Sequence, residues 1–220
     1  MRKTLCSVML ALFVCLFLGA PASASSVLYD NGFNGQVSGW TINFGFAVTD
    51  SFTLASNSTL TGVNIWLWQF PGDTSSAVDW GISNTSDFGS GVAGLTGAAL
   101  STVTDLGYNG DEYDVTEYSL SLPNLALSAG TYWFSLQNLQ VSNGDPGYWD
   151  ITNGASACYE NSVGNCNSQD VGFGDSTLTN STAFQILGSG GAAVPEPASL
   201  TLIGLGLVGI AFARRRRANS

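Results

Sequence analysis

The chain has 220 residues, of which 16 are acidic, six are basic and none is histidine, giving a formal net charge of −10 at pH 7. The basic residues are Arg2, Lys3, Arg214, Arg215, Arg216 and Arg217, so residues 25–193 contain no Lys, Arg or His and carry every acidic residue except Glu196. A segment of this kind repels nucleic acid, and it lacks the side chains of a Ser-His-Asp site, an HExxH zinc site, a P-loop lysine or an arginine clamp.

Residues 1–24 are typical of a secretory signal peptide. Arg2 and Lys3 precede an apolar run over Leu5 to Leu18, and Ala22-Ser23-Ala24 forms a small-residue cleavage site. The pattern predicts a short signal helix that is removed, so that the mature chain begins near Ser25. A retained membrane helix is disfavoured because the apolar run is short.

Residues 25–187 show short alternating segments separated by Gly, Asn, Asp and Ser clusters. Residues 44–54, 78–82 and 118–122 alternate apolar with small or polar side chains, which places one face on a core and the other toward water. No helical periodicity of convincing length is present. The pattern predicts an all-β domain, an antiparallel β-sandwich of jelly-roll-like type with roughly eight to ten strands.

Residues 63–70 differ because both faces of the expected strand are apolar: Val63, Ile65 and Leu67 on one side, and Trp66, Trp68 and Phe70 on the other. Such a segment is either a central strand or one that carries an aromatic surface.

Six tryptophans suggest carbohydrate binding, since aromatic rings stack on sugar faces, while core packing is the alternative. Trp68 and Trp80 continue apolar alternations and are assigned to the core. Trp133, among polar neighbours, and Trp149, in the run Tyr148-Trp149-Asp150, are expected to be more exposed and are the candidates for glycan stacking.

Carboxylates could serve two purposes in such a chain. The segment 109–114 has the composition of a calcium loop, with Asp111 and Asp114 as candidate ligands, although turn formation also explains these residues. No other cofactor is expected. Asp111, Glu112, Asp114 and Glu117 form the densest acidic cluster, and glycoside hydrolysis is the main chemistry that carboxylates perform alone.

Cys158 and Cys166 are the two cysteines left after signal removal. Export places them in an oxidising compartment, so a disulfide is expected. Closing so small a loop stabilises the fold by about 2.5 kcal/mol in the chain-entropy model.

A small-residue segment over 188–193 is expected to be a flexible linker. The tail over 194–220 begins with Val194-Pro195-Glu196-Pro197 and continues with an uncharged apolar stretch over 198–213. Four arginines follow at once: Arg214, Arg215, Arg216 and Arg217. The stretch would form a transmembrane helix of about 24 Å, and the arginines would act as a membrane stop that holds its end in the cytoplasm.

This order of motif, apolar span and arginine cluster resembles the PEP-CTERM sorting signal of exported bacterial proteins. The resemblance implies recognition by an exosortase-type membrane protease, cleavage near the Pro-Glu-Pro motif, transient residence in the inner membrane, and transfer to the cell surface or extracellular matrix. Such systems accompany exopolysaccharide production.

The domain resembles an uncharacterised β-sandwich type found in such proteins, through the segments Asp50–Leu54, Leu60–Val63, Ala129–Trp133 and Tyr148–Asp150. No functional residue follows from this second resemblance. The sequence therefore favours a non-enzymatic surface or matrix protein associated with exopolysaccharide. The alternatives are a calcium-assisted carbohydrate-binding module and a carboxylate-dependent glycosidase.

Overall fold

The computed structural model describes residues 25–33, 39–86, 91–108, 113–154, 156–161, 164–165 and 181–190. These residues form strands and no helix, which confirms the all-β prediction. The strands are β1 (Ser26–Asp30), β2 (Gly39–Thr41), β3 (Ala47–Leu54), β4 (Ser58–Gln69), β5 (Ser75–Ser83), β6 (Ala93–Tyr108), β7 (Asp114–Leu127), β8 (Gly130–Val141), β9 (Tyr148–Thr152), β10 (Cys158–Glu160), β11 (Gly164–Asn165), β12 (Ser181–Thr182) and β13 (Phe184–Gly190).

All pairings are antiparallel, and the strands join in the order β1-β13-β4-β7-β6-β5-β8-β3-β10-β11. Numbering the eight strands β1, β3, β4, β5, β6, β7, β8 and β13 from one to eight gives the order 1-8-3-6 followed by 5-4-7-2. That nested order is the one that eight strands take in a jelly roll. The pairing thus agrees with the expected sandwich type.

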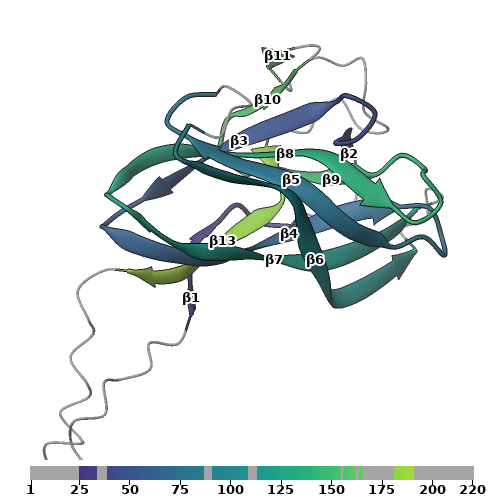
Figure 1. Cartoon of the computed structure of the whole chain (residues 1–220), viewed down its shortest axis with the longest axis horizontal. Coiled ribbons are helices and arrows are strands. Elements are labelled where there is room, and N and C mark those ends of the chain that lie inside the picture. Colours follow the sequence, from purple (N-terminus) through teal and green to yellow (C-terminus); the bar gives the residue numbers. More distant parts are fainter. Residues whose placement is uncertain are drawn as a thin grey trace, which may run out of the picture.

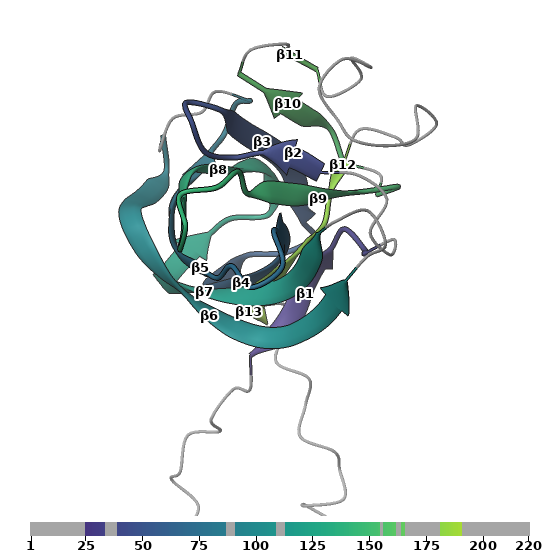
Figure 2. The same cartoon turned by 90° about the vertical axis from the view of Figure 1, so that its right-hand side faces the viewer.

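The two halves of the structure are hydrogen-bonded to each other through β6, so the sheet curls into an open half-barrel around its core (Figures 1 and 2). Residues 93–99 of β6 pair with β5, and residues 100–108 pair with β7. Register shifts interrupt both ladders. Bulges of this kind increase local twist, which lets one long strand turn from the upper layer into the lower one.

The core lies between the two halves. β8 contributes Tyr132, Phe134 and Leu136 from above, and β4 contributes Val63, Ile65 and Leu67 from below. These are the apolar faces that the alternation in the sequence predicts. The all-β assignment therefore follows from a two-residue repeat of buried side chains.

β4 exchanges partners along one edge. Its residues 58–65 pair with β13, while Leu67 and Trp68 pair with β9, and β7 covers the other edge throughout. β9 is in turn flanked by β2 and β12. The segment 148–152, which includes Trp149, therefore lies inside the structure.

The predicted start of the flexible linker at residue 188 is wrong. Residues 188–190 belong to β13 and pair with residues 58–60 of β4. A Cβ atom on Gly188 would lie 2.2 Å from the backbone oxygen of Thr59. The small residues here permit close contact between strands rather than flexibility.

The two predicted processing segments lie outside the described residues. These are the signal peptide over 1–24 and the tail over 194–220. The tail includes the whole predicted membrane stop, Arg214, Arg215, Arg216 and Arg217. The helices expected in both segments therefore stay predictions.

Candidate functional site

Trp133 and Tyr159 form an aromatic pair on the outer face of the upper layer. Trp133 alternates with the core residues Tyr132 and Phe134 on β8, and Tyr159 follows the buried Cys158 on β10, so both side chains point away from the core. Their rings meet edge to face with centroids 5.4 Å apart. Both residues are partly exposed.

The pair bridges β3, which lies between β8 and β10. Ser51 of β3 stands opposite Trp133, and Thr49 stands opposite Tyr159. Because these two side chains are small, the rings can meet across the intervening strand. The backbone N–H of Ala157 donates to Ser51 Oγ at 2.9 Å, which fixes the segment entering β10 against β3.

Polar groups continue this outer face along β8 and β5. The side chain of Asn138 donates to Asp79 Oδ2 at 2.8 Å, and the backbone N–H of Gly97 donates to Asp79 Oδ1 at 2.6 Å. The Asp79–Asn138 group lies further along this face, because Asp79 is opposite Gln137 whereas Trp133 is opposite Ser83. The partly exposed aromatic pair itself is suited to a neutral, hydroxyl-rich ligand. Sequence reasoning identified Trp133 here and missed Tyr159, whose neighbours in the chain give no strong alternation.

Trp149 does not lie beside Trp133, and the expectation that it is exposed is wrong. Its relative exposure is 0%, its ring packs edge to face against Phe134 and Phe184, and its Nε1–H donates to the carbonyl of Ala183 at 2.9 Å. The run Tyr148-Trp149-Asp150 that suggested exposure belongs to a strand covered on both edges. Trp149 is a core residue and offers no surface for stacking.

Trp68 and Trp80 are buried, as expected. Trp68, however, belongs to a second cluster, on the other face of β4, formed by Trp66, Trp68, Tyr113, Val115, Tyr148 and Ala183. Phe33 stacks on Trp66 and Phe70 stacks on Tyr113. The two-faced pattern of residues 63–70 thus marks a central strand whose aromatic side is covered.

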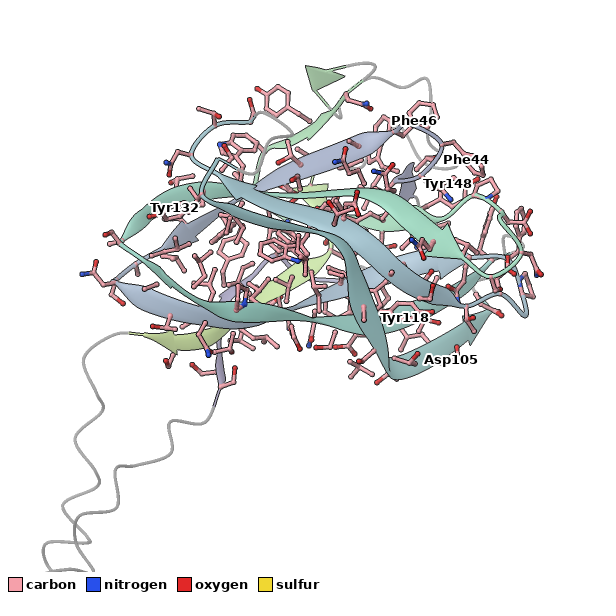
Figure 3. The ribbon with its side chains drawn as sticks, viewed as in Figure 1. Phe44, Phe46, Asp105, Tyr118, Tyr132 and Tyr148 are labelled. Carbon is pink, nitrogen blue, oxygen red and sulfur yellow. The ribbon has the colours of Figure 1, made fainter. Side chains whose placement is uncertain are left out.

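Phe44 is the most exposed large apolar side chain among the described residues, at 64%. It lies in the turn before β3 with φ of 56°, a left-handed conformation that is uncommon outside glycine. The turn is closed by a hydrogen bond from the Phe46 N–H to the Asn43 carbonyl at 3.0 Å. Figure 3 shows Phe44 and Phe46 at the outside of the structure, whereas Tyr118 lies between the layers.

The burial of two carboxyl groups was not predicted from the sequence. Asp50 and Asp150 each have a relative exposure of 0%, and each has one oxygen without a hydrogen-bond partner. Burial raises the pKa of Asp50 to about 6, against the opposing effect of hydrogen bonds from Ser156 and Thr182. Burial likewise raises the pKa of Asp150 to about 8, opposed by a hydrogen bond from Trp68. The signal for Asp50 was its position, since it alternates with Val48 and Phe52 on the face that enters the core.

Of the two candidate calcium ligands, only Asp114 lies among the described residues. Asp114 is the first residue of β7 and is partly exposed, while Asp111 lies outside the described residues. Within the described ranges, no three His, Cys, Asp or Glu side chains come together as a metal site. The proposed Asp111–Asp114 site stays a prediction.

The two described residues of the predicted acidic cluster, Asp114 and Glu117, lie on opposite faces of β7. Asp114 and Glu117 are three positions apart in a regular part of β7, opposite Gln69 and Trp66 of β4, and therefore point to opposite faces. Glu117 accepts a hydrogen bond from Asn64 at 3.0 Å, and burial raises its pKa. Glu112, like Asp111, lies outside the described residues. The two visible carboxylates do not face each other.

Cys158 is buried at the start of β10, and its expected partner Cys166 lies outside the described residues. The disulfide therefore stays a prediction. The described part of the chain contains no helix of the length and apolarity needed to cross a membrane. The apolar span 198–213 is not part of it.

Comparison with known proteins identifies the C-terminal end of the chain. The family described as the PEP-CTERM protein-sorting motif matches residues 193–217. That range contains the motif Val194-Pro195-Glu196-Pro197, the apolar span at 198–213 and the basic residues Arg214, Arg215, Arg216 and Arg217. The predicted motif, span and arginine cluster thus fall inside one matched segment. No curated protein matches the chain.

Proposed function

From the premise that this chain is an exported protein with a PEP-CTERM motif, sorted to the cell surface by an exosortase, we propose that it is a non-enzymatic component of the surface or extracellular matrix, associated with exopolysaccharide. The single observation that carries the proposal is the match of residues 193–217 to the sorting motif. The tail brings the domain to the inner membrane, and cleavage near Pro195–Pro197 then releases it to the outside.

A non-enzymatic role is supported by the residue types that the domain lacks. Residues 25–193 have no His, Lys or Arg to act as general base, Schiff-base amine or oxyanion clamp. Its chemistry is thus limited to carboxylates, hydroxyls and amides. A formal charge of −15 on this segment, which holds every acidic residue except Glu196, suits retention among neutral polymers or cations better than polyanions.

The Trp133–Tyr159 pair is our candidate for the surface that meets polysaccharide. It is aromatic and partly exposed, and it lies on the upper layer, while β1 and β13, which lead to the two ends of the chain, lie below (Figures 1 and 2). A domain held by its tail would therefore present the pair away from the point of attachment. Jelly rolls are frequent among lectin domains, an analogy of fold that agrees with this role without establishing it.

The pair also supports the second candidate function, a carbohydrate-binding module assisted by calcium at Asp111 and Asp114. It differs from the first in requiring measurable affinity for a defined glycan. A carboxylate-dependent glycosidase has less support, since Asp114 and Glu117 point to opposite faces of β7. Lack of turnover on a panel of glycans would count against it.

Sorting is tested by deleting Val194–Ser220 and by replacing Pro195 and Pro197 with alanine in the producing cell. Fractionation and intact mass should show loss of tail cleavage and altered destination for both variants. A matched control is Ala198→Gly, which leaves the Pro-Glu-Pro motif intact. Unchanged processing and destination in the deletion variant would refute the proposal.

Glycan association is tested by affinity electrophoresis through gels that contain the producer's own exopolysaccharide. The exported protein should be retarded, and Trp133→Ala and Tyr159→Ala should each reduce retardation several-fold. Trp133→Phe keeps a ring and should retain most of it. Equal mobility with and without polymer would remove the glycan-binding part of the proposal while leaving the sorting part intact. Adding a chelator separates the calcium-assisted module from a calcium-independent surface.

A further inference from the structure

Asp50 is a carboxylate on the core-facing side of β3, between Val48 and Phe52. Its Oδ2 accepts hydrogen bonds from the backbone N–H of Thr182 at 2.5 Å and from the Thr182 hydroxyl at 2.9 Å, and its buried Oδ1 has no partner. Among the residues of 25–193 there is no Lys, Arg or His that could neutralise it. Any positive charge beside Asp50 must therefore come from a proton or from a bound cation.

Oxygen atoms from three other segments surround the side chain of Asn31, next to Asp50. The Asn31 Nδ2 lies 2.6 Å from Ser156 Oγ, 2.6 Å from the Thr182 carbonyl oxygen and 3.5 Å from Asp50 Oδ2, and it also contacts Ser181 Oγ. An amide NH₂ has two protons, so it cannot donate to all four oxygens at once; the serine hydroxyls also donate, as Ser181 Oγ does to Asp50 Oδ2 at 3.3 Å. The nitrogen thus occupies the centre of an oxygen-lined position.

The amide of Asn31 can be reversed without losing its outer partner. Its Oδ1 now accepts the Tyr29 hydroxyl at 3.0 Å. A phenol hydroxyl both donates and accepts, so Tyr29 would serve Nδ2 equally well, and the two amide atoms exchange places by rotation of the side chain. Asn31 Oδ1 would then take the position that Nδ2 now holds, among the oxygens of Asp50, Ser156, Ser181 and Thr182, and these side chains would move outward to admit an ion between them.

From this arrangement we infer that Asp50, Asn31, Ser156, Ser181 and Thr182 form a calcium site. These residues offer one charged group, the Asp50 carboxylate with its two oxygens, and several neutral oxygens. Calcium binds six to eight oxygen ligands of this kind. Magnesium requires a tighter octahedral shell and keeps its waters, which a cradle of protein oxygens at this depth does not favour. The ion would join the end of β1 to β3, β12 and the segment before β10.

This site shares no residue with the candidate calcium ligands Asp111 and Asp114, and it does not rest on the proposed function. Export places the domain where calcium is available at the concentrations that extracellular modules use, about 10⁻⁴–10⁻³ M. A single carboxylate with neutral oxygens is expected to bind in that range rather than more tightly, because affinity rises with ligand charge.

The test uses the exported protein as the cell processes it, stripped with chelator and then titrated with CaCl₂ or MgCl₂. Calcium should raise the unfolding temperature by several degrees and bind with one-to-one stoichiometry in calorimetry, whereas magnesium should bind at least tenfold more weakly. Terbium should show luminescence sensitised through Tyr29. Equal responses to both metals would overturn the assignment to calcium.

Three variants locate the site. Asp50→Asn should abolish the calcium response, and Ser156→Ala, at a partly exposed position, should weaken binding at least tenfold without removing a charge. Asp73→Asn is the matched control, because Asp73 is also a buried carboxyl with an unpartnered oxygen but lies in the turn between β4 and β5. No calcium response in the parent protein, a response kept by both Asp50→Asn and Ser156→Ala, or one lost equally in Asp73→Asn, would overturn the proposal.

Discussion

The indole N–H of Trp68 donates to Asp150 Oδ1 at 2.7 Å, while Asp150 Oδ2 is buried without a partner. One neutral donor cannot compensate an ionised carboxylate in this environment, and burial raises the pKa of Asp150 to about 8. The carboxyl group is therefore mainly protonated at pH 7. In a domain without basic side chains, protonation takes the place that an ion pair holds elsewhere.

The first prediction concerns stability against pH. Because the folded pKa of Asp150 lies above its unfolded value, its contribution is fully present below about pH 4 and is lost as the pH rises through about 8. Urea unfolding in chelator should show the free energy of unfolding falling between about pH 4 and pH 8, by about 1.4 kcal/mol per pH unit from this group, and levelling off above pH 8. Asp50, whose pKa is about 6, contributes its own fall at lower pH.

Asp150→Asn should flatten the profile between pH 6 and pH 8, because the amide keeps an acceptor for Trp68 and does not ionise. Asp105→Asn is the control, since Asp105 is exposed and only caps the backbone N–H of Gly107 at 2.8 Å. A profile for Asp150→Asn that runs parallel to that of the parent protein would show that another group titrates.

The second prediction separates the two tryptophans that the sequence grouped together. Trp149→Ala should destabilise the domain by about 3–5 kcal/mol, because it empties a core position between Phe134 and Phe184. Trp133→Ala should cost about 1 kcal/mol or less, since the ring is partly exposed. Denaturant unfolding at constant pH measures both values. Similar losses for the two variants would contradict the assignment of Trp133 to the surface.

The third prediction tests the close contact between β13 and β4. In Gly188→Ala the added Cβ would lie 2.2 Å from the Thr59 backbone oxygen, so the strands must separate, and a loss of about 1–3 kcal/mol is expected. Gly91→Ala is the control, since its Cβ would meet Ser83 Oγ, a movable side-chain atom, at 3.2 Å. If both substitutions had the same small effect on the denaturant midpoint, residues 188–190 would not be held in the strand.

The fourth prediction is the disulfide between Cys158 and Cys166. Peptide mapping of the exported protein without reductant should yield the linked pair, and reduction should lower the free energy of unfolding by about 2.5 kcal/mol. Alkylation of both thiols in unreduced, unfolded protein would disprove the pairing. Because Cys158 is buried, the assay must be made after denaturation.

The strands that the sequence predicts are those in which alternation is regular. Residues 47–54 and 78–82 show it clearly, since one side of each strand enters the core. Residues 93–108 form the longest strand and show no such pattern. The register shifts in β6 change which side chains face the core along the strand. Leu95, Val103 and Leu106 are exposed, so an apolar side chain in β6 does not indicate a buried position.

Of the two tryptophans predicted to lie on the candidate surface, only Trp133 does. Local polarity placed Trp133 correctly: it lies on the outer face of β8 with the exposed Thr131 and the partly exposed Gln137, although Ser135 between them is buried. The expectation of exposure for Trp149, which rested on the run Tyr148-Trp149-Asp150, failed because β9 is covered by β2, β12 and β4, segments distant in the chain. The grouping of Asn31 with Asp50 also depends on contacts more than 100 residues apart, from β12 and Ser156.

β1 and β13 lie side by side, with Ser26 opposite Gly188. A pull on the tail therefore loads β13 along its length, against hydrogen bonds to β1 on one edge and to β4 on the other. These ladders must slide together rather than open one bond at a time, so the domain resists force at its point of attachment. Under the proposed function, β13 would act as a mechanical tether during the interval before the tail is cut.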